Sequence, residues 1–258
     1  RFVVQECPAL GIHLTDTQIV SLLLYADDLV LMAHTPADLQ TLLDVLHTFS
    51  VANHLTVNVK KSKVLACGAP EWGGHVLYGG KPLPTEQSFV YLGVRFFASY
   101  HDRGNAFLNM QSSLSKAKQA LGAMRSRCRE LGIHNVSILS RLFDSLVCSV
   151  LNYGCEMWGV YQVHDFARKG WGSNSACEQM HKTFLRFSFQ VNSKTTCAVM
   201  MNEARRRPLV HSWCQRAVGW WNRVASRGDS DIAYIALRDS VSHVSTLVDK
   251  PLKCWALA

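Results

Sequence analysis

The 258-residue sequence contains no long uninterrupted apolar segment. A helix that spans a membrane needs roughly 20 consecutive apolar residues. The longest candidate, residues 21–33, is interrupted by Asp27 and Asp28. Because 48% of the residues are apolar, the chain can still bury a core. We therefore expect a globular protein that has no membrane partner.

The sequence also lacks the spacing patterns of several common sites. Its nine cysteines form no CxxC pair and no regular series, which argues against zinc sites and disulfide frameworks. Reduced thiols are typical of an intracellular protein, nuclear or cytoplasmic. No GxSxG, P-loop or HExxH motif is present. The first residue is Arg1 instead of Met, so we expect a fragment of a longer protein.

Acidic residues are scarce relative to basic ones. The chain has 27 Lys and Arg against 19 Asp and Glu, a net charge of +8, which favours a polyanionic partner. Residues 103–129 contain no acidic residue but hold six basic ones: Arg103, Lys116, Lys118, Arg125, Arg127 and Arg129. Such a run is either a phosphate-binding surface or a merely solvated helix face. A second basic cluster, Arg205-Arg206-Arg207, is a weaker candidate for phosphate contact.

The first hundred residues show the patterns of strands and one helix. Apolar runs at residues 11–14, 18–24 and 29–33 predict antiparallel strands joined by tight turns. Thr35-Pro36 predicts the start of a helix that ends near Asn53-His54. Alternation predicts a strand over residues 55–59, and another short strand is expected over residues 89–96. This part therefore predicts an α+β layer, an antiparallel sheet with a packed helix.

After residue 102 the pattern becomes helical. Apolar residues recur at helical spacing from Phe107 to Leu131, and a second helix after Asn135 should turn Leu139, Leu142, Leu146 and Val150 inward. Further helices are expected over residues 177–189, 209–227 and 231–240. Trp213, Trp220 and Trp221 could stack on bases, but their spacing favours core packing.

Two adjacent carboxylates occupy the turn between the apolar strands 19–24 and 29–32. The apolar flanks predict a buried hairpin with a charged tip, and buried charge requires a cation or a partner. Oxygen ligands of this kind suit Mg²⁺. Paired metal ions held by such carboxylates stabilise the attacking and leaving oxygens in phosphoryl transfer. These residue types are therefore typical of nucleotidyl transfer.

Several motifs occur in an order that resembles one family. Tyr25-Ala26-Asp27-Asp28 is similar to the aspartate motif of reverse transcriptases, particularly those of non-LTR retrotransposons. Leu55-Thr56-Val57-Asn58 with Lys61 resembles the family's next motif, and Tyr91-Leu92-Gly93-Val94 resembles its primer-grip turn. Residues 151–158 are similar to the block that ends the family's thumb, and Glu203 with Pro208-Leu209 resembles a weaker later block.

The resemblance implies specific roles for these residues. Asp27 and Asp28 would bind Mg²⁺ in a two-metal site, and Lys61 would lie near the triphosphate of the incoming dNTP. The residues implied at the primer end are Tyr25, Ala26, Tyr91, Leu92 and Gly93. The basic residues Lys116, Lys118, Arg125, Arg127 and Arg129 would follow the RNA template and DNA primer. Lys61 could equally be a solvated lysine.

The resemblance also predicts how the chain is divided. Residues 1–102 would be a partial palm, 103–160 a helical thumb and 161–258 a helical region after the thumb. The family's first metal-binding aspartate and its fingers lie well upstream of the aspartate hairpin, with no credible replacement here. We therefore expect a truncated RNA-directed DNA polymerase that is inactive unless an upstream polypeptide completes the site.

Two other interpretations remain open. The chain could be a non-catalytic nucleic-acid-binding remnant whose basic helix survives. It could also belong to a group II intron maturase, which shares the aspartate hairpin. The block at residues 151–158 and the lack of a nuclease motif disfavour the maturase.

Overall fold

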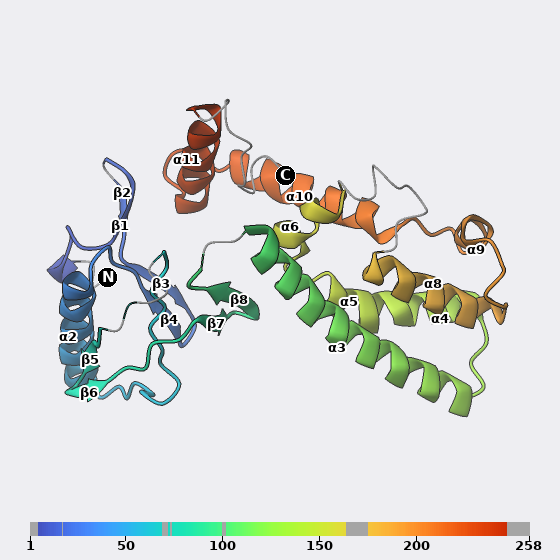
Figure 1. Ribbon diagram of the computed structural model, residues 1–258, viewed down its shortest axis with the longest axis horizontal. Coiled ribbons are helices and arrows are strands. Elements are labelled where there is room, and N and C mark those ends of the chain that lie inside the picture. The colour runs from blue at the N-terminus through green and yellow to red at the C-terminus, as the bar shows by residue number, and fades with distance from the viewer. Residues whose placement is uncertain are drawn as a thin grey trace. The chain divides into compact units, whose positions relative to one another are not determined.

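The computed structural model describes residues 5–16, 18–68, 72, 74–99, 102–163 and 175–246. It confirms an α+β protein in which helices combine with small antiparallel sheets. The chain forms two compact units, shown in Figure 1. The first contains residues up to 101 together with Gly228–Thr246, and the second contains Asp102–Arg227. The palm, thumb and post-thumb division stays a prediction.

The strands of the first unit pair in sequence order. They are β1 (Ile12–Thr15), β2 (Gln18–Val20), β3 (Leu22–Tyr25), β4 (Asp28–Leu31), β5 (Leu77–Tyr78), β6 (Lys81–Pro82), β7 (Ser88–Tyr91) and β8 (Val94–Phe97). Each consecutive pair is a separate two-stranded antiparallel sheet, so the described residues form no continuous sheet like the one we expected. The predicted strand 18–24 is wrong as a single strand, because it divides at buried Ser21. The predicted strand 89–96 is likewise a hairpin.

Helix α2 (Pro36–Ala52) begins and ends where the sequence predicted. The Thr35 hydroxyl accepts a hydrogen bond from the Asp38 backbone N–H at 3.1 Å, which caps the helix. At the other end, His54 has φ 54°, and the Leu55 N–H donates to the Ser50 carbonyl at 2.8 Å. This left-handed residue followed by a 6→1 hydrogen bond is a Schellman ending.

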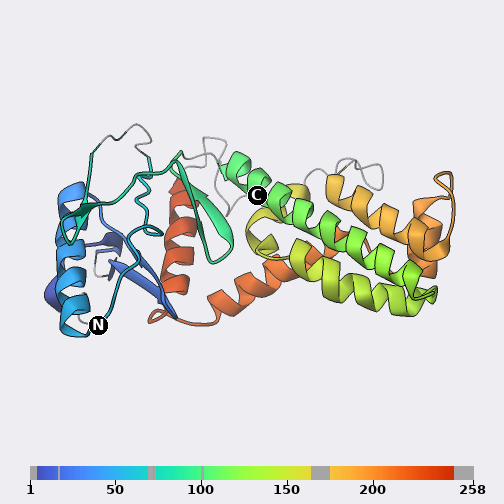
Figure 2. The same cartoon turned by 90° about the horizontal axis from the view of Figure 1, so that it is seen from below.

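The core of the first unit lies between α2 and the chain around β5 and β6. Leu42, Leu43 and Leu46 of α2 pack with the buried residues Val64, Val76, Tyr78 and Leu83. Helix α11 (Ile232–Thr246) contacts β1 and so joins this unit from late in the chain (Figure 2). The predicted strand 55–59 is wrong, because this segment is irregular and enters a turn. The Asn58 carbonyl accepts hydrogen bonds from Lys61 and Ser62 there.

Helix α3 (Asp102–Glu130) carries the apolar seam that the sequence predicted. Its inward residues Met110, Leu114, Ala117, Leu121, Met124 and Cys128 are all buried. The two outermost positions of the predicted seam are wrong, since Phe107 is 49% exposed and Leu131 is 58% exposed. Leu131 follows the last helical residue, where the helical spacing no longer fixes its direction.

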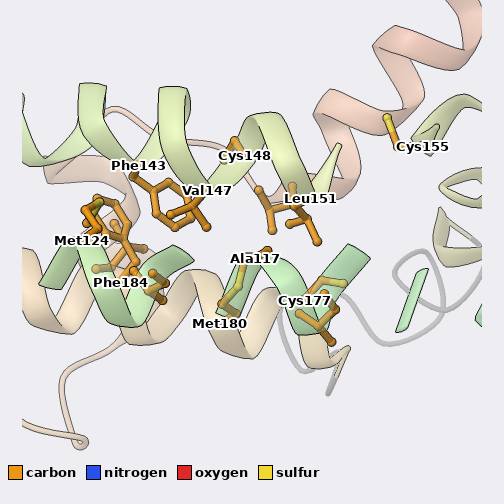
Figure 3. Close-up of a cluster of buried hydrophobic side chains, with 14 of the residues drawn as sticks. Ala117, Met124, Phe143, Val147, Cys148, Leu151, Cys155, Cys177, Met180 and Phe184 are labelled. Carbon is orange, nitrogen blue, oxygen red and sulfur yellow. The ribbon is translucent and has the colours of Figure 1, made fainter. Parts of the chain in front are cut away.

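The second predicted helix is continuous but changes its winding. It consists of α4 (Val136–Leu142), the π-helix η1 (Phe143–Cys148) and α5 (Ser149–Leu151). A π-helix has i→i+5 hydrogen bonds, so it shifts the inward positions relative to an α-helix. Phe143, Val147 and Leu151 are fully buried and face the residues of α3 and α8 in Figure 3. Leu146 is 48% exposed, so its predicted inward direction is wrong.

The remaining helices of the second unit are α6 (Cys155–Trp158), α8 (Ala176–Phe189), α9 (Cys197–Glu203) and α10 (Leu209–Ala225). Buried Trp213 of α10 packs edge-on against Trp158, and its indole N–H donates to the Asn152 side chain at 2.9 Å. The block at residues 151–158 therefore anchors α10. Burial raises the pKa of the Cys148 and Cys155 thiols to about 12, so both stay protonated and pack as small apolar groups.

In the parts of the chain that the structure describes, no helix is both long and apolar enough to cross a membrane.

Candidate functional site

The aspartate motif forms a tight hairpin between β3 and β4. Tyr25 pairs directly with Asp28, so Ala26 and Asp27 are the two turn residues. Ala26 has φ 54°, a left-handed conformation that side chains larger than hydrogen seldom adopt. A positive φ at the first turn position is typical of hairpin turns whose twist matches their strands. The turn therefore places Asp27 at the tip and Asp28 at the start of β4.

This hairpin is exposed, which corrects the expectation of a buried hairpin. Leu24 is 64% exposed and Tyr25 is 66% exposed, and both aspartates are exposed as well. The main core of the unit lies instead around α2. Because exposed carboxylates keep their hydration, burial alone does not require a neutralising cation here. A metal site at Asp27 and Asp28 is therefore indicated only by the residue types and their arrangement.

The carboxylates suit a hard cation, but the site has few ligands. Mg²⁺ is commonly held by one or two carboxylates together with substrate phosphates. Asp27 and Asp28 therefore fit the donor chemistry of one such ion. Within the described residues, no group of three His, Cys, Asp or Glu side chains could hold a metal. The described residues thus supply two carboxylates that suit one ion and no third carboxylate beside them.

The other motif residues of the first unit also lie in exposed turns. Lys61 is exposed, and its backbone N–H donates to the Asn58 carbonyl at 3.0 Å. Leu92 and Gly93 form the two-residue turn of the β7–β8 hairpin, with φ 47° and 78°, and Tyr91 pairs with Val94 beside it. The sheets β3–β4 and β7–β8 are not hydrogen-bonded to each other.

The basic residues of α3 divide between two flanks of the helix. At 100° per residue, Lys118, Arg125 and Arg129 share one flank, and Lys116 and Arg127 share the other. Arg127 forms an ion pair with Glu130 at 2.8 Å. The guanidinium carbons of Arg125 and Arg129 lie 5.1 and 5.6 Å from the ring centre of Phe187 in α8. The side chain of Arg103 lies outside the described residues.

The second basic cluster is not a uniform phosphate surface, and that expectation is wrong for its central residue. Arg206 donates two hydrogen bonds to Asp144, at 2.6 and 3.1 Å, and one to His181 at 3.1 Å. Its side chain is only 13% exposed. Arg206 is therefore engaged within the fold, while Arg205 and Arg207 are exposed.

Comparison with known proteins supports the resemblance for the first part of the chain. Residues 9–96 match the family model described as reverse transcriptase (RNA-dependent DNA polymerase). This part of the chain is therefore similar to reverse transcriptases. An uncharacterized transposon-derived protein of Caenorhabditis elegans is 29% identical over 141 residues, which cover 52% of this chain. The match covers 47% of that relative, so this chain aligns with about half of its length.

Sequence reasoning missed a residue that the structure brings to the α3 flank. Arg186, in the last turn of α8, lines the same cavity as Arg125 and Arg129. The run without acidic residues ends at Arg129, and no pattern in the sequence connects it with Arg186, which lies 57 positions later. The amphipathic pattern of α8 was a usable signal, because it places that helix against α3.

Proposed function

We propose that the chain is part of an RNA-directed DNA polymerase of a non-LTR retrotransposon, formed by the later part of the palm and the thumb. The observation that carries this proposal is the Tyr25-Ala26-Asp27-Asp28 hairpin, which lies inside the region that matches the reverse transcriptase family. The order of the later motifs and the basic flank of α3 support it. The transposon-derived relative is consistent with the retrotransposon origin.

In this proposal the exposed turns of the first unit act on the nucleotide and the primer. Asp27 and Asp28 would hold Mg²⁺, which stabilises the attacking and leaving oxygens of nucleotidyl transfer. Lys61 would donate a proton to the departing pyrophosphate. Tyr25, with the small Ala26 behind it, and the turn formed by Tyr91, Leu92 and Gly93 would position the primer end.

The basic residues of α3 would hold the primer and the RNA template through their phosphates. Lys116, Lys118 and Arg129 are exposed and free to reach a strand, and Arg125 is partly buried beside them. Arg127 would have to exchange its Glu130 partner for a phosphate.

Two carboxylates are fewer than a two-metal site uses. The described residues bring no third metal ligand to the hairpin. We therefore propose that a further carboxylate comes from polypeptide that precedes this chain in the intact protein. The isolated chain would then bind its substrates but would not polymerise, because much of the transition-state stabilisation depends on the complete metal site.

Primer extension on an RNA template with Mg²⁺ tests the proposal. We compare the chain alone, the chain joined to its upstream genomic segment, and the joined form with Asp27→Asn. We expect extension only from the joined form, and a loss of at least about 100-fold with Asp27→Asn, the size found when one transition-state contact is removed.

Asp44→Asn is the matched control, since Asp44 is an exposed aspartate of α2 away from the hairpin. It should leave extension unchanged in the joined form. Extension by the chain alone would refute the need for an upstream carboxylate. Equal activity of the Asp27→Asn and unchanged joined forms would refute the metal role.

A non-catalytic nucleic-acid-binding module is the second candidate. The exposed hairpin without a third ligand and the basic α3 flank favour it. This candidate predicts that the joined form binds a primer and template but extends neither. The extension assay therefore separates the two candidates directly.

A further inference from the structure

A cavity of about 500 Å³ lies within the second unit, between α3 and the last turns of α8. Its wall is completed by the segment that leads into α4 and by the residues that follow α8. The lining residues are Arg125, Arg129, Ile133, His134, Leu139, Thr183, Arg186, Phe187, Gln190 and Val191. Three of them are arginines and none is acidic.

Two arginines of this cavity each have a buried donor that no described residue satisfies. The Nε atoms of Arg125 and Arg186 are buried and have no hydrogen-bond partner within the part of the chain that the structure describes. Arg186 uses one terminal nitrogen to donate to the Ser193 carbonyl at 3.3 Å. Arg125 and Arg129 lie over the Phe187 ring, which attracts cations but accepts no strong hydrogen bond.

Some other arginines of this unit have an acidic partner. Asp144 binds Arg206 through both oxygens, and Glu130 pairs with Arg127. Three guanidinium groups in one cavity repel each other, and the reduced dielectric constant near the protein interior strengthens that repulsion. Buried donors without partners also oppose folding. An anion in the cavity would relieve both costs, which is why we regard this cluster as a binding site.

We propose that this cavity binds a phosphate group of a nucleic-acid strand. Guanidinium forks match the oxygens of phosphate, and three arginines line this cavity. The cavity is larger than a phosphate needs, so it leaves room for the attached sugar. It is continuous with the α3 flank that carries exposed Lys118, which would contact a neighbouring phosphate. The choice of a strand over a free nucleotide rests on the proposed function, whereas the phosphate chemistry rests on the cavity alone.

Binding of a labelled 12-nucleotide single-stranded RNA to the full chain tests this assignment. Each phosphate contact contributes about 0.7 to the slope of log Kd against log salt concentration. Arg186→Gln keeps a polar side chain with hydrogen-bond donors but removes its charge. We expect it to weaken binding at low salt and to reduce the slope by about 0.7. Arg129→Gln, at an exposed position where folding is not at risk, should do the same.

Arg141→Gln is the matched control. Arg141 is an exposed arginine of α4 outside the cavity, and its substitution removes the same charge as Arg186→Gln does. It should leave the slope unchanged. Equal slopes for Arg186→Gln and Arg141→Gln, with no stabilisation by adenosine monophosphate, would overturn the site. Adenosine monophosphate provides a second probe. It could raise the melting temperature of the unchanged chain but not of Arg186→Gln, while the RNA slopes of Arg186→Gln and Arg141→Gln stay equal. In that case the ligand is a free nucleotide and the strand assignment is wrong.

The result is separable from the polymerase assay. Asp27→Asn should bind the RNA with an unchanged slope, since the hairpin is not part of the cavity. Failure of the joined form to extend a primer would refute the polymerase and leave the slope difference between Arg186→Gln and Arg141→Gln intact.

Discussion

At the scale of single residues, the surroundings of buried His181 in the second unit decide its protonation state. His181 is fully buried and stacks on Phe143. Its Nε2 accepts from Arg206, so the neutral ring carries its proton on Nδ1, which lies 3.5 Å from a Glu178 oxygen. Burial lowers the pKa of His181, and the nearby Glu178 only partly opposes this shift. The fold therefore holds this histidine neutral.

A pH dependence of stability follows from that lowered pKa. The unfolded chain binds a proton at His181 near pH 6.5, whereas the folded chain resists it. The free energy of unfolding should therefore be at its full value above about pH 6.5 and fall as the pH decreases toward the folded pKa, by up to about 1.4 kcal/mol per pH unit. Urea unfolding followed between pH 5 and 7.5 measures this slope.

His181→Phe should flatten the dependence below pH 6.5, because the stacked ring remains but the titrating group is gone. His211→Gln, at an exposed position of α10, is the control and should retain the slope. A dependence on pH that is identical in His181→Phe and the unchanged chain would show that other groups cause it.

The same residues show where sequence reasoning reached its limit. Arg205, Arg206 and Arg207 are indistinguishable in the sequence, yet only Arg206 is engaged by Asp144. That partner lies 62 positions earlier, so only the packing of η1 against α8 and the following loop could reveal it. By contrast, the aspartate motif is local, and the sequence correctly placed it in a tight turn.

At the scale of elements, the residues at which helices begin were more predictable than the direction of the side chains within them. Thr35 and Asn135 cap their helices through side-chain bonds to nearby backbone N–H groups, which is chemistry contained within four residues. The inward face after Asn135 depended on the π-helix, which apolar spacing cannot reveal when α-helical winding is assumed. The prediction of a strand over residues 55–59 was wrong for a related reason. The alternation of apolar and polar residues was present, but no strand among the described residues provides hydrogen bonds to this segment.

The β7–β8 hairpin depends on a backbone conformation that glycine supplies. Gly93 has φ 78° in a turn where Leu92 is also left-handed. Gly93→Ala should weaken the hairpin by about 1–2 kcal/mol, because a Cβ is unfavourable in that conformation. Hydrogen exchange of the backbone amides in β7 and β8 measures the local change.

Gly93→Asn is the comparison for this element, since asparagine tolerates left-handed angles better than alanine does. The backbone amides of β7 and β8 should exchange more slowly in Gly93→Asn than in Gly93→Ala. Equal exchange rates in both variants would mean that the turn conformation does not limit hairpin stability. For the proposed polymerase, comparing primer extension by the same pair of variants would test the proposed primer-grip role.

At the scale of the whole molecule, the chain has two separate cores, and the first of its two compact units does not follow the sequence order. One core surrounds Leu42 of α2, and the other surrounds Leu151 of α5. Helix α11 directly follows α10 in sequence but belongs with the first unit, where it contacts β1. Local patterns predicted α11 as a helix, but they carry no information about the unit that its apolar face joins.

Two leucines allow the two cores to be tested with one matched pair of variants. Leu42 and Leu151 are both fully buried, and each belongs to a different core. Leucine to alanine changes at such positions cost about 2–5 kcal/mol. Leu42→Ala should therefore speed hydrogen exchange in α2 and β5, and Leu151→Ala should speed it in α3 and α8.

Helix α11 is the discriminating element in that experiment. If its buried Ile235 and Leu237 are part of the first unit, its amides should respond to Leu42→Ala and stay protected in Leu151→Ala. Sequence proximity alone would couple α11 to α10 and reverse that result. A uniform increase over all described helices in both variants would show one cooperative unit instead, because a single unfolding reaction exposes every amide together.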